Sequence, residues 1–327
     1  MAGVALALLA TLVVAVPAAW GSLALWFRTP GRQPLRGASA LSWALFSTTI
    51  LLAIWRGRAG AAVGVFAPAF ACMLLWWRRI PASNDREWAD DVARMTTGVV
   101  DGSRVALDNV RNFEWRTLTD YTPRWENREY DLDQLKSVDI ILSYWAGKAI
   151  AHMLVSFGFG DGGRVAFSVE IRRERHETFS EIRGFFKEFE LSVIAADERD
   201  VVRVRTNVRG EDAYLYRLRI PTRAMRELFL GYVDEANALV LAPRWYNTIT
   251  ANCTSLVYLM MRRIVGYLPL DLRVIFSGYL PGYIYKVGGL DTRYPLETLR
   301  ELGHITQRAR EADLSPTFSK DIRRGIP

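Results

Sequence analysis

The first 80 residues are dominated by long runs of uncharged, mostly apolar positions. Residues 4–27 contain no charged side chain, and neither do residues 37–55 or residues 59–77. As a helix the first run would be about 36 Å long, which is enough to cross a hydrocarbon core of ~30 Å. Each of the other two runs ends at a Trp followed by Arg, a pattern typical of the membrane interface. We therefore predict a membrane domain over residues 1–80 with three transmembrane helices.

An alternative interpretation is a cleaved signal peptide followed by a helical hairpin in a soluble core. Uncharged runs of this length are rare in soluble cores. In addition, only Met, Ala and Gly precede the first run, which therefore lacks the positive n-region of a signal peptide. Both observations favour three membrane helices.

A polar linker at residues 81–85 follows, and we place the domain boundary near residue 82. Beyond it, strict alternation of apolar and polar residues predicts a β-hairpin. Apolar residues occupy the odd positions of 153–159 and 165–171, on either side of a Gly-Asp-Gly-Gly break. Keeping one apolar face leaves two registers. One sets His152 opposite Glu170. The other sets it opposite Arg172 with Glu170 on the diagonal, and in both His152 stands on the polar face.

The rest of the second domain, residues 82–327, is expected to be α+β. We predict short strands and loops over 98–145, a short helix over 179–189, strands over 201–205 and 214–220, and a helix over 222–239. Apolar positions spaced by one, three and four residues predict another helix that ends near Gly266. Cys253 lies in its first turn, and Asn252 is the expected N-cap.

The net positive charge of the chain belongs to the apolar third. The sequence has 42 Lys and Arg against 35 Asp and Glu, and residues 1–80 contain seven Arg but no acidic residue. The remainder is neutral overall, so no nucleic acid partner is expected. Five of the seven Arg lie on the side of the predicted helices that carries the second domain. The positive-inside rule taken alone therefore places this domain in the cytoplasm.

Cys253 is the candidate nucleophile, since the other cysteine, Cys72, lies inside the third apolar run. At a helix N-terminus a thiol feels the positive end of the helix dipole, which favours the thiolate. Unpaired N–H groups at the same place can stabilise an oxyanion.

A cysteine nucleophile also needs a base. Of the three histidines, His176 and His304 are expected at the surface. His152 has Glu170 on the partner strand, a carboxylate able to fix its tautomer. Spacing alone supports an inert buried thiol and a packed histidine equally well.

Other chemistries have less support. The sequence contains no H-E-x-x-H or C-x-x-C motif, so no metal site is expected. It also contains no G-x-S-x-G or P-loop motif, so a serine nucleophile and a P-loop both lack support. Gly158, Gly160 and Gly163 match G-x-G-x-x-G, but they open an alternating strand rather than a helix. We therefore expect a hairpin turn and no cofactor.

Several strings in order resemble the Lnb N-terminal periplasmic domain family over roughly residues 82–320. They are 143–145 (SYW), 151–157 (AHMLVSF), 167–172 (FSVEIR), 184–186 (GFF), 197–200 (DERD), 214–216 (YLY) and 246–254 (YNTITANCT). The family includes a lipoprotein intramolecular transacylase, which moves an acyl chain from the diacylglyceryl group to the N-terminal amine of the same lipoprotein. The resemblance implies that Cys253 is the nucleophile and His152 its histidine, in a permuted papain-like fold.

The resemblance also implies a periplasmic domain, against the arginine distribution, and we follow the resemblance because three spans from a cytoplasmic N-terminus deliver the domain outside. The family transacylase has membrane helices after its catalytic domain, whereas here the apolar segments precede it. Donor and acceptor sites can therefore differ.

We accordingly expect a multi-pass protein of the bacterial inner membrane with a cysteine acyl-transfer domain. Its partners would be the lipid bilayer and a lipoprotein or phospholipid substrate. Cys253 would form a thioester, His152 would move the proton, Glu170 would orient His152, and Asn252 would assist. The alternatives are an envelope thiol peptidase or amidase that uses the same residues, and a non-catalytic binding protein.

Overall fold

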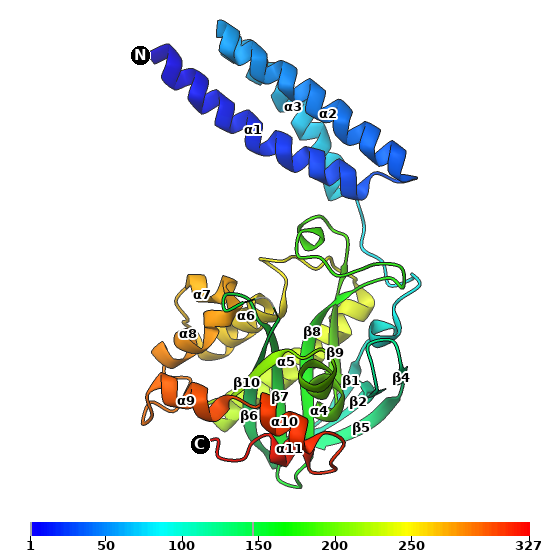
Figure 1. The fold of residues 1–327 in the computed structure, drawn as a ribbon, viewed down its shortest axis with the longest axis vertical. Coiled ribbons are helices and arrows are strands. Elements are labelled where there is room, and N and C mark those ends of the chain that lie inside the picture. Colours follow the sequence, from blue (N-terminus) through cyan, green and yellow to red (C-terminus); the bar gives the residue numbers. More distant parts are fainter. Residues whose placement is uncertain (1, 146) are drawn as a thin grey trace. The chain divides into compact units, whose positions relative to one another are not determined.

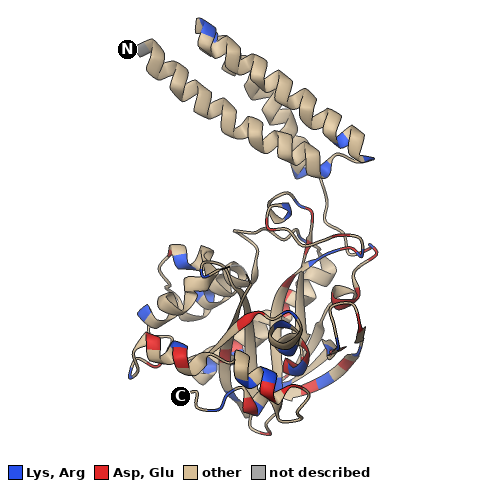
Figure 2. Cartoon of the chain, viewed as in Figure 1, with Lys and Arg blue, Asp and Glu red and all other residues tan. Residues whose placement is uncertain are grey.

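The computed structural model describes residues 2–145 and 147–327, which divide into two compact units (Figure 1). The helical unit comprises the chain up to Ser83 together with the segment Phe179–Phe189. The sheet domain comprises Asn84–Thr178 and Glu190–Pro327. The long helices of the helical unit carry basic residues only near their ends, whereas acidic and basic residues are scattered over the sheet domain (Figure 2).

The helical unit contains α1 (Ala2–Arg28), α2 (Gln33–Ala53) and α3 (Ala59–Arg78). A turn, η1 (Ile54–Arg58), separates α2 from α3, and within it Gly57 has φ 79° and ψ 13°. Glycine adopts this left-handed conformation easily because it has no Cβ, and α3 packs back on α1 and α2. Two helical stretches are long and apolar enough to cross a membrane, Gly3–Arg28 and Gln33–Arg78. The second stretch includes α2, the turn and α3.

These helices bury only the sides that face one another. Val14, Ile54 and Phe66 form their core. On the outer side of α1, Leu12 is 65 % exposed and Val16 is 67 % exposed. An apolar outer surface of this kind is unfavourable in water and suits a lipid environment.

The segment Phe179–Phe189 differs from the helix that we predicted. It contains a single 3₁₀ turn, η4 (Arg183–Phe185), and the chain adopts a positive φ of 55° at Lys187, which an α-helix cannot accommodate. Phe186 stacks on Phe27 at 5.2 Å between ring centroids. Lys187 Nζ donates to Trp77 O at 2.7 Å. The helix prediction is therefore wrong beyond one turn, because contacts with α1 and α3 decide the conformation.

The sheet domain is built on an eight-stranded sheet of order β1-β2-β9-β8-β7-β6-β10, with β5 paired to β2. The pairs are antiparallel except for a short parallel contact between β2 and β9. The strands are β1 (Thr97–Asp101), β2 (Arg104–Arg111), β5 (Trp125–Asp131), β6 (Leu135–Tyr144), β7 (His152–Phe159), β8 (Arg164–Arg172), β9 (Glu190–Ala196) and β10 (Asp212–Arg217), and a separate small sheet pairs β3 (Glu114–Trp115) with β4 (Tyr121–Thr122). The fold is mixed α+β, as predicted.

The predicted hairpin is β7 and β8. Leu154 pairs with Ser168, and Gly158 pairs with Arg164. The turn is closed by the N–H of Gly162, which donates to Phe159 O at 3.1 Å. Continued along the strands, this register sets His152 opposite Glu170, the first of the two alternatives.

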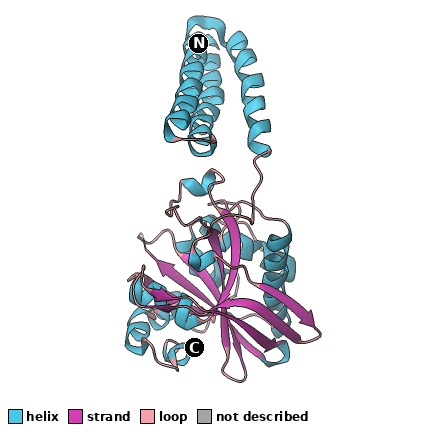
Figure 3. Ribbon diagram, turned by 90° about the vertical axis from the view of Figure 1, so that its right-hand side faces the viewer, coloured by secondary structure: helices cyan, strands magenta, loops and turns pink. Residues whose placement is uncertain are grey.

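Helices cover both faces of the sheet (Figure 3). On one face, α5 (Thr222–Leu241) and α6 (Cys253–Val265) pack on the odd positions of the hairpin. Phe157 and Phe167 there meet Phe229 edge to face, at 5.0 and 5.3 Å between centroids. The remaining helices are α4 (Glu198–Val201), α7 (Leu272–Ile275), α8 (Leu280–Lys286), α9 (Leu296–Gly303), α10 (Thr306–Ala312) and α11 (Phe318–Asp321).

The second face is buried as well, which corrects the expectation of one apolar and one polar face. Leu154 and Ala166 pack there with Phe318 from the C-terminal segment. The polar positions are paired in an internal ionic cluster. Ser156 Oγ donates to Glu198 at 2.5 Å, and Arg323 Nε donates to Asp139 at 2.8 Å. Burying these polar groups is tolerable because each is hydrogen-bonded.

The strand predicted over residues 201–205 is also wrong. The chain there forms α4, followed by η5 (Val204–Val208). Asp197 caps α4 by accepting from the N–H of Arg199 at 2.9 Å, and Asp200 is fully buried against Arg111. Val201, Val202 and Val204 are buried too. Because the segment buries more than one face, its β-branched residues do not distinguish a buried helical turn from a strand.

Candidate active site

Cys253 and His152 meet where α6 begins and β7 begins. Helix α6 packs on β7 and β8, so its first turn lies against the start of the histidine strand. The Cys253 residue is 8 % exposed, and the His152 side chain is 12 % exposed. The chain thus brings together two residues separated by a hundred positions in the sequence.

The helix start is held by Asn252, which is the N-cap, as predicted. Its side-chain oxygen accepts from the N–H groups of Thr254 and Ser255, each at 2.8 Å. Ser255 Oγ in turn accepts from the N–H of Asn252 at 2.9 Å, completing a capping box. The Asn252 amide nitrogen donates to Thr248 O at 2.6 Å. These side-chain hydrogen bonds lie within the helix start and the loop before it, and they fix the position of Cys253.

The environment of the sulfur favours the thiolate. Burial by itself raises the pKa of Cys253, but the positive charge and hydrogen bonding of His152 lower it. Interactions with the Met153 backbone and the Thr254 side chain lower the pKa further, so its net shift is downward. Nearby positive charge and hydrogen-bond donors are the usual means of lowering a thiol pKa.

The imidazole has the complementary shift. Burial and the charge of Arg205 lower the pKa of His152, while the charges of Glu170 and Cys253 raise it, for a net pKa of about 9. The two shifts together favour a thiolate beside an imidazolium at neutral pH.

Glu170 lies against the other side of the ring. His152 Nε2 is 3.2 Å from Glu170 Oε1 and 2.8 Å from Ser168 Oγ. Ser168 Oγ also donates to Glu170 Oε1, at 2.6 Å. Burial alone would raise the pKa of Glu170, but His152 and Arg205 hold it well below its usual range. Nε2 is therefore the ring nitrogen that contacts both Ser168 and Glu170.

A buried arginine, Arg205, completes the arrangement. Its Nη2 donates to Glu170 at 3.1 Å, and its Nη1 donates to Glu211 at 3.4 Å. Glu211 also accepts from Ser143 Oγ at 2.5 Å. Sequence reasoning missed these residues. Ser168 could have been found as the neighbour of Glu170 on the same strand face, but Arg205 had no signal because its segment was predicted as a strand.

One backbone donor remains at the helix start. Asn252 occupies the N–H groups of the second and third helical residues, and Leu256 N donates to Asn252 O at 3.2 Å. Within the described part of the chain, the N–H of Cys253 has no hydrogen-bond partner. It is the N-terminal donor available to an oxyanion formed by attack of the sulfur.

The other two histidines lie away from this site. The His176 side chain is 76 % exposed. His304 pairs with Asp212 at 2.5 Å and stacks on Tyr214. Both are surface residues, as expected. In the described ranges no group of three or more His, Cys, Asp or Glu side chains is arranged to hold a metal ion.

Comparison with known families gives one match. Residues 121–281 match the family model described as the Lnb N-terminal periplasmic domain. No curated protein matches the chain, and no solved structure does. The matched range is just under half of the sequence and includes Cys253, His152, Glu170 and Asn252. Residues 121–281 of the chain are thus similar to the Lnb N-terminal periplasmic domain family, and apolar helical stretches long enough to cross a membrane lie near the N-terminus.

Proposed function

We propose that the chain is a membrane-anchored cysteine enzyme that transfers acyl groups through a thioester on Cys253. The observation that supports this proposal is the buried row of contacts from Cys253 to His152 to Glu170. A nucleophile, a base beside it and a third group that orients the base are what covalent acyl transfer requires. An inert structural thiol needs none of these partners.

In the first half-reaction the Cys253 thiolate attacks the carbonyl carbon of an ester. The carbon–sulfur bond forms, and the carbonyl electron pair moves to oxygen, where the N–H of Cys253 donates to the oxyanion. Collapse breaks the bond to the alkoxide, which leaves with the proton of the His152 imidazolium. In the second half-reaction an amine attacks the thioester, and His152 takes the proton that the amine loses. The thiolate departs, and an amide is released.

The membrane anchor favours a lipid-linked acyl donor. Apolar helices that precede the matched domain in the chain would anchor it to the bilayer that contains such a substrate, and the family resemblance implies a lipoprotein or phospholipid ester. A helix-borne cysteine against an antiparallel sheet, preceded in the chain by the histidine strand, also supports a permuted papain-like fold. With an amide as the acyl donor and water as the acceptor, the same site would hydrolyse peptides or amides.

The test is a comparison of two cysteine variants of the full chain in a lipoprotein N-acylation assay with intact mass detection. Cys253→Ala should abolish both the acyl-enzyme and product, while Cys72→Ala, which removes the exposed thiol of α3, should retain both. Full activity of Cys253→Ala would refute the proposal. An acyl-enzyme that yields only free acid would assign hydrolysis instead.

We further propose that α1, α2 and α3 each cross the membrane, with the matched domain in the periplasm. Three crossings from a cytoplasmic N-terminus end outside, although five of the seven arginines of residues 1–80 lie on that side. Alkaline phosphatase fused after residue 327 should be active. An inactive phosphatase fusion together with a fluorescent green-fluorescent-protein fusion would place the domain in the cytoplasm.

A further inference from the structure

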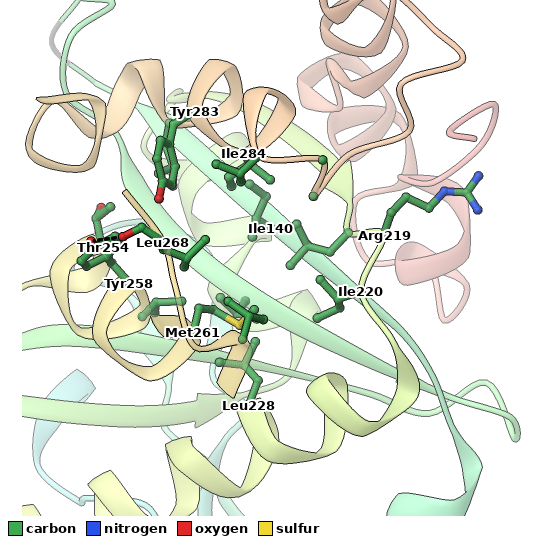
Figure 4. Close-up of a pocket in the computed structure, with 18 of the residues that line it drawn as sticks. Ile140, Arg219, Ile220, Leu228, Thr254, Tyr258, Met261, Leu268, Tyr283 and Ile284 are labelled. Carbon is green, nitrogen blue, oxygen red and sulfur yellow. Dashed lines mark hydrogen bonds between the residues drawn. The ribbon is translucent and has the colours of Figure 1, made fainter. Parts of the chain in front are cut away.

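The sheet domain contains a cavity of about 360 Å³ that the chemistry described above does not use. It lies between the β6–β7 part of the sheet, α6 and the segment from Leu280 to Gly289 (Figure 4). At the ~30 Å³ that one water occupies in the liquid, it holds about twelve groups of that size. This volume is within the usual range for small-molecule sites.

The cavity follows one face of α6. Its lining includes Thr254, Val257, Tyr258, Met261 and Val265, which are spaced by one, three and four residues and therefore share a side of the helix. At 1.5 Å per residue, the stretch from Thr254 to Val265 is about 16 Å long. The shape suits an elongated guest lying beside the helix.

The walls provide no free charge. Among the described residues of the lining, Arg219 alone is charged. It pairs with Asp291, and its guanidinium points away from the apolar side chains (Figure 4). The hydroxyls of Tyr258 and Tyr283 donate to Leu268 O and Pro269 O, each at 2.9 Å. A polar guest would lose its hydrogen bonds to water without replacement, so the cavity favours an apolar one.

Two residues of the lining, Met153 and Thr254, lie next to Cys253, which does not line the cavity itself. Thr254 lines the cavity, and its Oγ1 is 3.8 Å from Cys253 Sγ. Met153 lines it as well, and its backbone lies near enough to the sulfur to lower the pKa of Cys253. A chain attached through its carbonyl to Cys253 would therefore begin at Met153 and Thr254 and could continue along α6.

We propose that this cavity binds a single hydrocarbon chain of the acyl donor and limits its length, with Met261 as a specificity-determining residue. This inference rests on the proposed function. Met261 is partly buried against the core and lies two helical turns beyond Thr254, so a larger side chain at this position would block the cavity without touching Cys253 or His152.

The first experiment measures chain length. Activated acyl esters of 2 to 16 carbons are offered to the full chain in lipid nanodiscs, and acylation of Cys253 is followed by intact mass. Each buried methylene should raise the acylation rate by about fourfold until the cavity is filled, near twelve carbons. Met261→Trp should shorten the preferred chain and lower the rate with twelve carbons by at least tenfold. The rate with the two-carbon ester should fall far less than the rate with twelve carbons, because a short chain does not reach Met261.

The matched control is Leu259→Trp, which enlarges a residue of the same helix that is 43 % exposed and lies outside the lining. It should preserve the chain-length profile. If Met261→Trp fails to fold, Val265→Phe at the far end of the cavity takes its place. Equal rates for all chain lengths, or identical profiles for the cavity and control variants, would overturn the inference.

A second experiment does not depend on catalysis. Dodecanoic acid with a photoactivatable diazirine near its methyl end is added to Cys253→Ala in nanodiscs of phosphatidylethanolamine and phosphatidylglycerol. Crosslinks should map to α6 and Leu280–Gly289, and Met261→Trp should reduce them at least fivefold. Crosslinks confined to α1–α3 would refute the cavity assignment. Crosslinks in the cavity without any acyl-enzyme in the wild type would instead refute the proposed acyl transfer.

Discussion

The charge of Glu170 should set the ionisation of the candidate active site, and Glu170→Gln tests this with almost no change in shape. The carboxylate is 3.2 Å from His152 Nε2, and the two side chains are 18 % and 12 % exposed, so solvent screens them little. An opposite charge this close shifts a pKa by roughly one to three, equivalent to about 1.4–4 kcal/mol. In the variant the nearby charge of Arg205 also loses one of its two carboxylate partners.

The pKa of His152, about 9 in the native protein, should therefore fall by roughly one to three in Glu170→Gln. A smaller fraction of imidazolium at neutral pH raises the pKa of Cys253, because the thiolate loses its counter-charge. We expect the rate of alkylation of Cys253 at pH 7 to fall about tenfold or more. The acidic limb of its pH profile should move to higher pH.

The assay is alkylation by iodoacetamide from pH 4 to pH 10, in a Cys72→Ala background so that Cys253 is the thiol followed. Glu174→Gln is the control, since Glu174 is a paired carboxylate whose partners are Arg86 and His176 rather than His152. Thermal melting of each variant separates loss of charge from loss of fold. Superimposable pH profiles for wild type and Glu170→Gln would refute the reasoning.

Three further predictions concern stability. Asn252→Ala removes the acceptor of two N–H groups and should lower the free energy of unfolding by about 1 kcal/mol and slow the alkylation of Cys253. Asn252→Asp should retain the wild-type stability. Equal denaturation midpoints for the Ala and Asp variants would contradict the capping role. Arg323→Met leaves Asp139 and Glu198 buried with one fewer partner each and should lower the free energy of unfolding by about 3–5 kcal/mol. Urea denaturation measures this loss, with Arg324→Met at an exposed position as the control. Phe229→Ala opens the aromatic core around Phe157 and Phe167 and should cost about 3–5 kcal/mol, and a loss below ~1 kcal/mol would mean that this core repacks.

Local sequence pattern alone was enough for the features that one segment determines by itself. The three apolar runs correspond to α1, α2 and α3, and alternation predicted β7 and β8. The apolar spacing predicted α5 and α6, and Asn252 was recognised as a cap. Each of these depends on the 3.6-residue or two-residue period of side chains along one element, or on hydrogen bonds within one helical turn.

Local pattern failed where a segment buries more than one face. Residues 201–205 are apolar enough for a strand but form α4 and η5, because the second face of the sheet is covered rather than open to water. Residues 179–189 lack the predicted helix because Phe186 and Lys187 make their contacts with α1 and α3. Tertiary contacts outweigh the weak preference of a short segment.

The candidate site shows the same division. The residue types and the strand and helix that carry them could be inferred from the sequence, and so could the two possible partners of His152. The choice of Glu170 over Arg172 required the turn of the hairpin to close at a definite residue. The approach of Cys253 to His152, the contact of Arg205 with Glu170 and the cavity along α6 depend on how α6 and η5 pack against the sheet. Periodicity along the chain contains no information about contacts between residues far apart in it, so only the packed structure decides them.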